Sequence, residues 1–309
     1  MKALCSCFIA AAMLTSTASF AAAEESVIAS IKPLHSLVAG VMAGIGEPGI
    51  IVDGAGSPHA YSLKPSQASN LQQAKLIFWV GHELEAFLEK PIETLGANAR
   101  IVELMDTDGL TQLALREGGT FEAHEPEHEH DDGDHDEFDL HVWLDPSNAK
   151  TMVGEIKRHL VEADPANKDT YSSNAKAMQA RIDKLTAEIE TILEPVKGKS
   201  FIVFHDGYRY FENRFDAHAA GSITVSPETI PGAERIAEIR AMVKKLGATC
   251  IFAEPQFEPR LVSVVMEGTN ARSGVLDPLG TSIKNGPELY FTLMRNMARS
   301  MRDCLSPES

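Results

Sequence analysis

Short apolar, β-branched runs alternate with helical patterns through both halves of the chain. Strands of three to five residues separated by helices indicate βαβ units, in which the strands pair in parallel. We therefore predict an α/β fold with one parallel sheet, flanked by helices, in each half. The runs expected to form strands are Val27–Ile31, Ile50–Val52, Leu76–Val80, Arg100–Leu104, Phe201–Phe204, Ser222–Val225, Thr249–Ala253 and Gly274–Leu276.

A different pattern separates these halves. Apolar residues recur at intervals of three or four positions, which places them on one face of a helix. Asp164-Pro165 precedes this stretch, and Pro195 with Gly198 ends it, as helix boundaries require. About 29 helical residues span roughly 43 Å, long enough to run along two lobes, whereas a core helix of one larger domain would normally be shorter. The residues of this face are Ala175, Met178, Ile182, Leu185, Ile189 and Ile192.

The length of 309 residues also favours two lobes, because one ordinary core does not grow to this size. We expect an N-terminal lobe at residues 24–163, a linker helix at 164–197 and a C-terminal lobe at 198–309.

The first 23 residues have the pattern of a secretory signal peptide. Lys2 is followed by an apolar stretch from Phe8 to Phe20 and by Ala21-Ala22-Ala23, a small-residue cleavage site. The apolar stretch is too short for a membrane span, and no later window is long enough for one. We expect a monomer exported to the periplasm, without a membrane span.

Removal of that segment leaves two cysteines, Cys250 and Cys304. An even number of cysteines in an oxidising compartment favours a disulfide between them. The alternative is a pair of buried free thiols.

The formal net charge is −16, which argues against nucleic acid as a partner because the phosphate backbone would be repelled. Much of this charge lies between residues 122 and 137, a tract with acidic residues and histidines but no Lys or Arg. Its low apolar content predicts a mobile loop, at about residues 117–138. Imidazole and carboxylate bind Zn²⁺, so the tract is either an auxiliary metal-capture segment or a charged surface linker. Its histidines are His124, His128, His130 and His135.

Candidate ligands follow several of the predicted strands. Ligands bind open parallel sheets outside the carboxyl ends of the strands, and His205, Glu254 and Asp277 come directly after such runs. His59 lies in a Gly-rich turn past the second strand, and His141 precedes a helix start. A single histidine in such a place is more often a hydrogen-bonded structural residue. Together, however, three histidines and one carboxylate fit a tetrahedral Zn²⁺ site between the lobes. The proposed ligands are His59, His141, His205 and Asp277.

Four segments of the sequence resemble the site-bearing segments of the metal-binding proteins of ABC importers. They are Ser57–Pro65 (SPHAYSLKP), His141–Pro146 (HVWLDP), Phe204–Asp206 (FHD) and Leu276–Gly280 (LDPLG). The resemblance covers the whole mature chain. Three histidines with an acidic tract resemble the high-affinity zinc uptake (ZnuA-like) branch, because manganese-binding relatives usually carry glutamate at the position of His205 and lack the tract.

This resemblance implies two α/β lobes joined by a helix, and no enzymatic activity. It also implies delivery of Zn²⁺ to a membrane permease driven by a cytoplasmic ATPase. By position, His59, His141 and His205 become ligands. Asp277 matches the fourth family position, which water or another carboxylate can share in zinc-binding members. Glu254 is expected to orient an imidazole, and Asp206 is expected to be structural. The histidines not expected to be ligands are His35, His82, His159 and His218.

Three other functions stay open from the sequence. A zinc hydrolase could use three histidines and an activated water, but the sequence has no His-Glu-x-x-His motif and no clear general base. A transporter of manganese or iron would use a similar fold with more oxygen ligands. An adhesin-like binding module is disfavoured by the lack of a lipid anchor.

Overall fold

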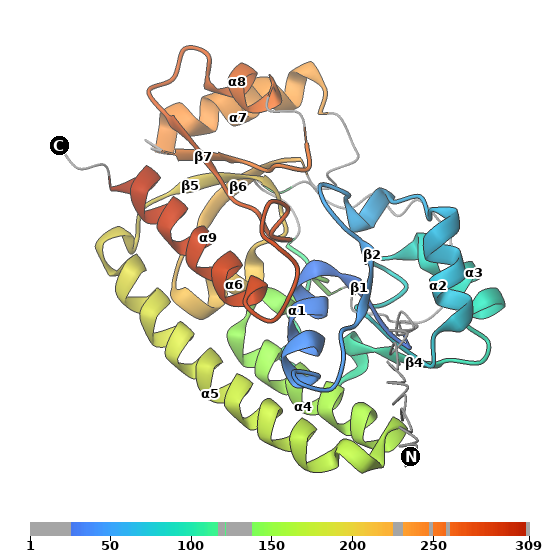
Figure 1. The fold of residues 1–309 in the computed structure, drawn as a ribbon. Coiled ribbons are helices and arrows are strands. Elements are labelled where there is room, and N and C mark those ends of the chain that lie inside the picture. Colours follow the sequence, from blue (N-terminus) through green and yellow to red (C-terminus); the bar gives the residue numbers. More distant parts are fainter. Residues whose placement is uncertain are drawn as a thin grey trace, which may run out of the picture.

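The computed structural model describes residues 26–116, 121, 138–224, 231–246, 250–257 and 260–306. The predicted signal peptide lies outside the described residues, and so do the tract histidines His124, His128, His130 and His135. The described chain contains two four-stranded sheets with only parallel pairing, one in each half. This architecture confirms the predicted α/β fold with two lobes (Figure 1).

The N-terminal sheet has the strand order β2-β1-β3-β4. Its two central strands, β1 and β3, are buried along their whole length, as strands covered by helices on both faces must be. The strands are β1 (Val27–Ile31), β2 (Gly49–Val52), β3 (Leu76–Trp79) and β4 (Arg100–Glu103).

The C-terminal sheet has the equivalent order β6-β5-β7-β8. Strand β6 begins at Ala219, before the predicted start at Ser222, because the small residues Ala219 and Gly221 pair with β5 despite their weak strand preference. Strand β8 ends at Val275, one residue before the predicted end. The strands are β5 (Phe201–His205), β6 (Ala219–Thr224), β7 (Cys250–Ala253) and β8 (Arg272–Val275).

Helices cover both sheets and fill the space between the lobes. The α-helices are α1 (Lys32–Val41), α2 (Pro65–Gln73), α3 (Ala86–Leu95), α4 (Pro146–Ala163), α5 (Lys168–Leu193), α6 (Arg209–Phe215), α7 (Ala233–Leu246), α8 (Arg260–Met266) and α9 (Leu289–Leu305). Short 3₁₀ turns lie at Pro58–Ala60, Leu104–Asp106, Val142–Leu144, Pro165–Asn167 and Glu194–Val196. Among the described helices, none is long and apolar enough to cross a membrane.

Helix α5 is the predicted linker helix. It has 26 residues, about 39 Å in length, and runs beside both lobes (Figure 1). Its apolar face packs against α1, α4 and α9. The buried face ends at Leu193, while Ile192 is only partly buried. The lobe boundaries at residues 163 and 198 stay predictions.

Two apolar clusters hold the molecule together. The larger one is continuous from the N-terminal sheet through α1, α4, α5 and α9 to the inner side of the C-terminal sheet. The smaller one lies between the C-terminal sheet and α7 and α8, and includes Ile202, Ile239 and Val262. A disulfide joins Cys250 of β7 to Cys304 of α9, which confirms the predicted pair.

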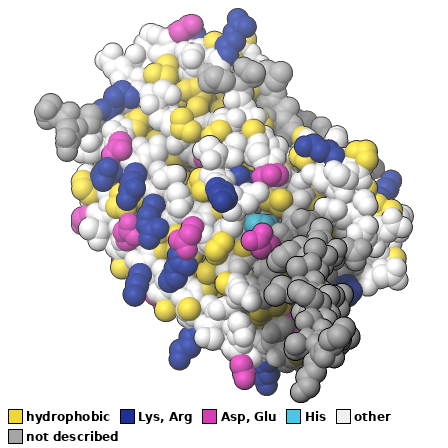
Figure 2. All heavy atoms as spheres, in the orientation of Figure 1, with side chains coloured by type: hydrophobic (Ala, Val, Ile, Leu, Met, Phe, Trp, Pro, Cys, Tyr) yellow, Lys and Arg dark blue, Asp and Glu magenta, His cyan; other side chains and the backbone are white. Residues whose placement is uncertain are grey.

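On the face drawn in Figure 2, basic and acidic side chains are mixed over α5 and α9. Arg295 of α9 pairs with Glu188 of α5, and Arg181 of α5 pairs with Glu288 just before α9. These ion pairs join the C-terminal helix to the linker on the solvent side of the core.

Candidate metal centre

His59 is presented by the loop that follows β2. Gly54 has a positive φ of 73°, which lets the chain turn directly after the strand. The 3₁₀ turn Pro58–Ala60 then places His59 at its centre, with the buried Pro58 before it. The Nε2 atom of His59 is buried and has no hydrogen-bond partner among the described residues.

His141 is fixed by an aspartate two residues earlier. The Oδ1 atom of Asp139 accepts from the backbone N–H of His141 at 2.9 Å and contacts Nδ1 of its ring at 2.8 Å. A proton on Nδ1 would leave Nε2 with a free lone pair, the state a metal ligand needs. Both side chains are buried.

His205 is fixed in the same way from the other lobe. It is the last residue of β5, and its Nδ1 lies 2.6 Å from Oε1 of Glu254, which follows β7. Because β5 and β7 are neighbouring parallel strands, their carboxyl ends bring these two residues together. The sequence-based expectation that Glu254 orients an imidazole is consistent with this contact and stays a prediction until tested.

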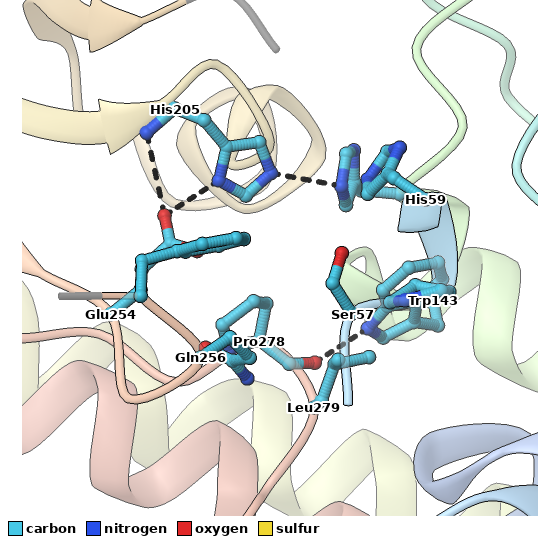
Figure 3. Close-up of a pocket in the computed structure, with 11 residues that line it drawn as sticks. Ser57, His59, Trp143, His205, Glu254, Gln256, Pro278 and Leu279 are labelled. Carbon is cyan, nitrogen blue, oxygen red and sulfur yellow. Dashed lines mark hydrogen bonds and ion pairs between the residues drawn. The ribbon is translucent and has the colours of Figure 1, made fainter. Parts of the chain in front are cut away.

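The imidazoles of His59 and His205 face the same pocket between the lobes (Figure 3), and the ring of His141 lies beside both. Each of His59, His141 and His205 offers one ligand atom within 4.8 Å of the others. The Nε2 atoms of His141 and His205 are 3.2 Å apart. Two nitrogens bound tetrahedrally to one ion at about 2.0–2.1 Å would be separated by about 3.3 Å. The spacing therefore suits a single small cation.

The electrostatics of the cluster disfavour a proton on His59. Burial lowers the pKa of His59 well below its usual value, and the neighbouring rings of His141 and His205 lower it further. Burial also disfavours the charged form of His205, but the carboxylates of Glu254, Asp139 and Asp206 together outweigh it and raise the pKa of His205. His59 is therefore kept neutral, the state in which its nitrogen can bind a metal, whereas the environment of His205 favours its charged form.

Trp143 forms a wall of the same pocket and ties the lobes together. Its side chain is fully buried, and Nε1 donates to the backbone oxygen of Pro278 at 2.8 Å (Figure 3). The hydroxyl of Tyr290 in α9 donates to the backbone oxygen of Trp143 at 2.9 Å. Pro278 and Leu279 line the pocket opposite the imidazoles.

Asp277 is not part of the group of close ligand atoms. Its carboxylate caps the turn that it begins, because it accepts from the backbone N–H groups of Gly280 at 2.9 Å and Thr281 at 2.6 Å. The side-chain amide of Gln256 also donates to it at 3.0 Å. The predicted role of Asp277 as a fourth ligand would require its oxygens to exchange some of these bonds.

The other histidines of the described residues, His35, His82, His159 and His218, lie outside the cluster. His35 contacts the backbone oxygen of Pro48, and His159 contacts Glu155 within α4. His82 lies near Glu103, and His218 lies near Asp216 on the surface. Asp206 forms an ion pair with Arg116, and its expected structural role stays a prediction.

Sequence reasoning missed two residues that surround the site. Asp139 could have been noticed from its position two residues before a candidate histidine, since an aspartate often accepts from the backbone two residues further on. Gly207 could not. A Cβ atom at Gly207 would lie 2.3 Å from Nε2 of His205 and 2.9 Å from Nε2 of His141, so only glycine fits there.

Two α/β lobes joined by a long helix, with a cation-sized set of ligands between them, define a two-lobed metal-binding solute-binding protein. The family model described as "Zinc-uptake complex component A periplasmic" matches residues 27–304. The chain therefore belongs to the ZnuA family.

Individual relatives agree with this assignment. The "High-affinity zinc uptake system protein ZnuA" of Brucella suis is 53% identical, over 99% of this chain and 100% of its own length. The protein of the same name from Yersinia pestis is 38% identical, over 93% of each chain. A crystal structure titled "Crystal structure of ZnuA" has the same fold, with a TM-score of 0.76 and 24% identity over 91% of this chain and 98% of that one.

Proposed function

We propose that this protein binds Zn²⁺ in the periplasm and delivers it to the membrane permease of an ABC importer, which a cytoplasmic ATPase drives. Membership of the ZnuA family supports this function, as do the names of its relatives. The observation that carries the proposal is that three imidazoles, contributed by both lobes, lie close enough together to bind a single cation.

The donor set favours zinc. The three close ligand atoms are all imidazole nitrogens, which suit Zn²⁺ better than Mg²⁺, Ca²⁺ or Mn²⁺. The carboxylates nearest to them, Asp139 and Glu254, contact Nδ1 atoms and so hold the rings rather than face the ion. Outer partners of this kind fix the tautomer and increase the basicity of the ligand nitrogen.

In this proposal His59, His141 and His205 are the ligands, and either Asp277 or water completes the coordination. Water requires no rearrangement, whereas Asp277 would have to leave the backbone N–H groups of its own turn. The tract histidines His124, His128, His130 and His135 would gather metal weakly near the site, and their high local concentration would speed its loading.

Release follows from the placement of the ligands on two lobes. His59 and His141 belong to the N-terminal lobe and His205 to the C-terminal lobe, so a small separation of the lobes removes one ligand from the ion. We propose that docking on the permease causes this separation.

The direct test is metal analysis of the purified protein, followed by zinc titration of His59→Ala with His218→Ala as a matched control. His218 is exposed and lies outside the cluster. We expect one tightly bound zinc per chain in the wild type and in the control, and a large loss of affinity in His59→Ala. Stoichiometric tight binding by His59→Ala would contradict the proposed ligand set.

Two further measurements separate the alternatives. Competition between zinc and manganese should leave zinc bound at equal concentrations of the two ions; preferential manganese binding would favour the other transport function. Turnover of ester or peptide substrates by the zinc-loaded protein would instead favour a hydrolase.

A further inference from the structure

Arg116 joins the N-terminal lobe to the C-terminal lobe beside the metal centre. Its Nε lies 3.0 Å from Oδ2 of Asp206, and a terminal nitrogen also contacts that carboxylate. Its two terminal nitrogens lie 2.9 and 2.8 Å from the two oxygens of Glu212. One guanidinium thus bridges two carboxylates with directional bonds from all its nitrogens, a geometry that lysine cannot reproduce.

This network is largely shielded from solvent. The side chains of Arg116, Asp206 and Glu212 are 20%, 11% and 3% exposed. The ring of Phe121 lies 4.1 Å from the guanidinium carbon, measured to its centroid, and covers it. Water and salt screen ion pairs of such limited exposure less than surface pairs, and loss of one partner leaves a largely buried charge uncompensated.

Asp206 begins the turn that supports two of the imidazoles. It follows His205 directly, and the backbone N–H of Gly207 donates to the backbone oxygen of His205 at 3.0 Å. At Gly207 the chain passes so close to the rings of His205 and His141 that a Cβ atom would clash with both. A shift of Asp206 therefore moves backbone that is in contact with both imidazoles.

Glu212 has a different place in the same network. It lies in α6, one turn after the start of the helix, and also accepts from the backbone N–H of Ala219 at 2.8 Å. It therefore ties α6 to β6, away from the imidazoles. The two carboxylates bound to Arg116 thus have separable roles. Asp206 contacts the turn beside the imidazoles, whereas Glu212 stabilises the packing of the C-terminal lobe.

The segment that carries Arg116 is itself anchored. The backbone N–H of Leu113 donates to the hydroxyl of Tyr210 at 3.1 Å, and Ala114 forms an antiparallel bridge with Phe138. The next residue, Asp139, donates its backbone N–H to the oxygen of Leu113 at 2.8 Å and also holds His141. The segment before Arg116 is therefore held in place by hydrogen bonds, one of which leads to Asp139, the residue that orients His141.

We propose that Arg116 is a positioning residue for the metal centre. Through Asp206 it holds the turn at Gly207 against the imidazoles of His141 and His205, and so keeps the ligand of the C-terminal lobe aligned with those of the N-terminal lobe. This inference rests on the proposed zinc-binding function. Loss of the Arg116–Asp206 contact should speed metal release without removing any ligand.

The test compares two variants that each neutralise one carboxylate, Asp206→Asn and Glu212→Gln. The readouts are the zinc release rate into excess chelator, the free energy of unfolding without metal, and the d–d spectrum of the Co²⁺-loaded protein. In Asp206→Asn we expect about ten-fold faster release and an altered Co²⁺ spectrum. This factor is the lower limit of the usual loss of metal affinity when a residue that holds a metal ligand is changed. In Glu212→Gln we expect the wild-type rate and spectrum, but a lower free energy of unfolding.

Arg116→Gln should show both faster zinc release and a lower free energy of unfolding. Compared with Arg116→Gln, Arg116→Lys should recover more of the free energy of unfolding than of the wild-type release rate. Arg295→Gln is the matched control, since Arg295 also forms a partly buried ion pair between elements, with Glu188, but away from the site. Its release rate should equal that of the wild type.

Equal release rates in Asp206→Asn and Glu212→Gln, or a wild-type rate in Asp206→Asn, would overturn the positioning role. This result is distinct from failure of the proposed function, in which the wild type itself would bind no zinc tightly or His59→Ala would bind it unchanged.

Discussion

The two lobes have the same sheet topology but supply the site in different ways. In the C-terminal lobe, His205 ends the strand that lies second in the sheet, and Glu254 follows its neighbour β7. In the N-terminal lobe, the corresponding strand β1 ends at Ile31, and Lys32 follows it at the position of Asp206. There the imidazoles come from a loop after β2 and from the segment before α4.

Lys32 joins the two lobes from this position. Its ammonium group donates to the backbone oxygens of Thr281 at 3.0 Å and Ile283 at 2.8 Å, in the loop that begins at Asp277. Burial lowers the pKa of Lys32, while Asp53 and Asp277 oppose this shift. The carboxyl ends of corresponding strands thus carry a proposed ligand in the C-terminal lobe and, one residue further on, an interlobe tether in the N-terminal lobe. Topology decides where chemistry is possible, and the side chain decides which chemistry occurs.

The largest expected effect tests whether both lobes are needed. Removal of one imidazole, by His59→Ala in the N-terminal lobe or His205→Ala in the C-terminal lobe, should weaken zinc binding by about 3–5 kcal/mol, a third of a typical protein–zinc interaction. That is roughly a hundred- to a thousand-fold or more in Kd, measured by competition with a chelator. If only one variant lost affinity, the site would belong to one lobe.

The disulfide distinguishes the C-terminal lobe, where it joins two residues 54 positions apart. The double variant Cys250→Ser/Cys304→Ser should lower the free energy of unfolding by about 4 kcal/mol, since the unfolded chain regains the freedom of a long loop. Urea denaturation followed by a probe in each lobe would measure it. An equal loss of stability in the N-terminal lobe would show that the two lobes unfold as one unit.

A buried carboxyl group distinguishes the N-terminal lobe. Glu85 is fully buried, and burial raises its pKa to about 7, although hydrogen bonds from the backbone N–H groups of Val80 and Gly81 oppose the shift. Between pH 4.5 and 7 the unfolded chain loses this proton while the folded protein keeps it, so stability falls as pH rises through this range.

The variant Glu85→Gln should remove this part of the pH dependence. Above pH 7 it should be more stable than the wild type, by up to about 3 kcal/mol, and near pH 4.5 this advantage should vanish. Unfolding curves at several pH values measure the difference. A constant difference across the range would mean that Glu85 does not titrate in this window.

The smallest expected effects compare the carboxylates that hold the imidazoles, one from each lobe. Asp139→Asn and Glu254→Gln keep an oxygen near Nδ1 but remove the charge. Each should weaken zinc binding by about 10- to 100-fold, as outer partners of metal ligands do. Isothermal titration with a competing chelator would measure both, with His218→Ala as the unchanged reference. No effect in either variant would reduce these carboxylates to structural groups.

Much of this molecule could be predicted from local sequence. Strand and helix patterns have periods of 2 and 3.6 residues, so the alternation of β-branched runs and the apolar face from Ala175 to Leu185 predict two sheets and a long helix. The disulfide was predictable because only one pair of cysteines follows the predicted signal peptide. Histidines at strand ends could be recognised because parallel strands direct their carboxyl ends to one edge.

The tertiary structure alone decided how these parts meet. Arg116 and Asp206 are 90 positions apart, and their contact depends on the packing of one lobe against the other. The placement of Asp277 in a turn, where its oxygens accept backbone N–H groups, also has no counterpart in a local pattern. Periodicity describes which face of an element is buried, but distances between side chains of different elements are set by the packing of the whole core. For this reason the sequence determined the candidate ligands, and only the folded chain decided which of them lie within reach of one ion.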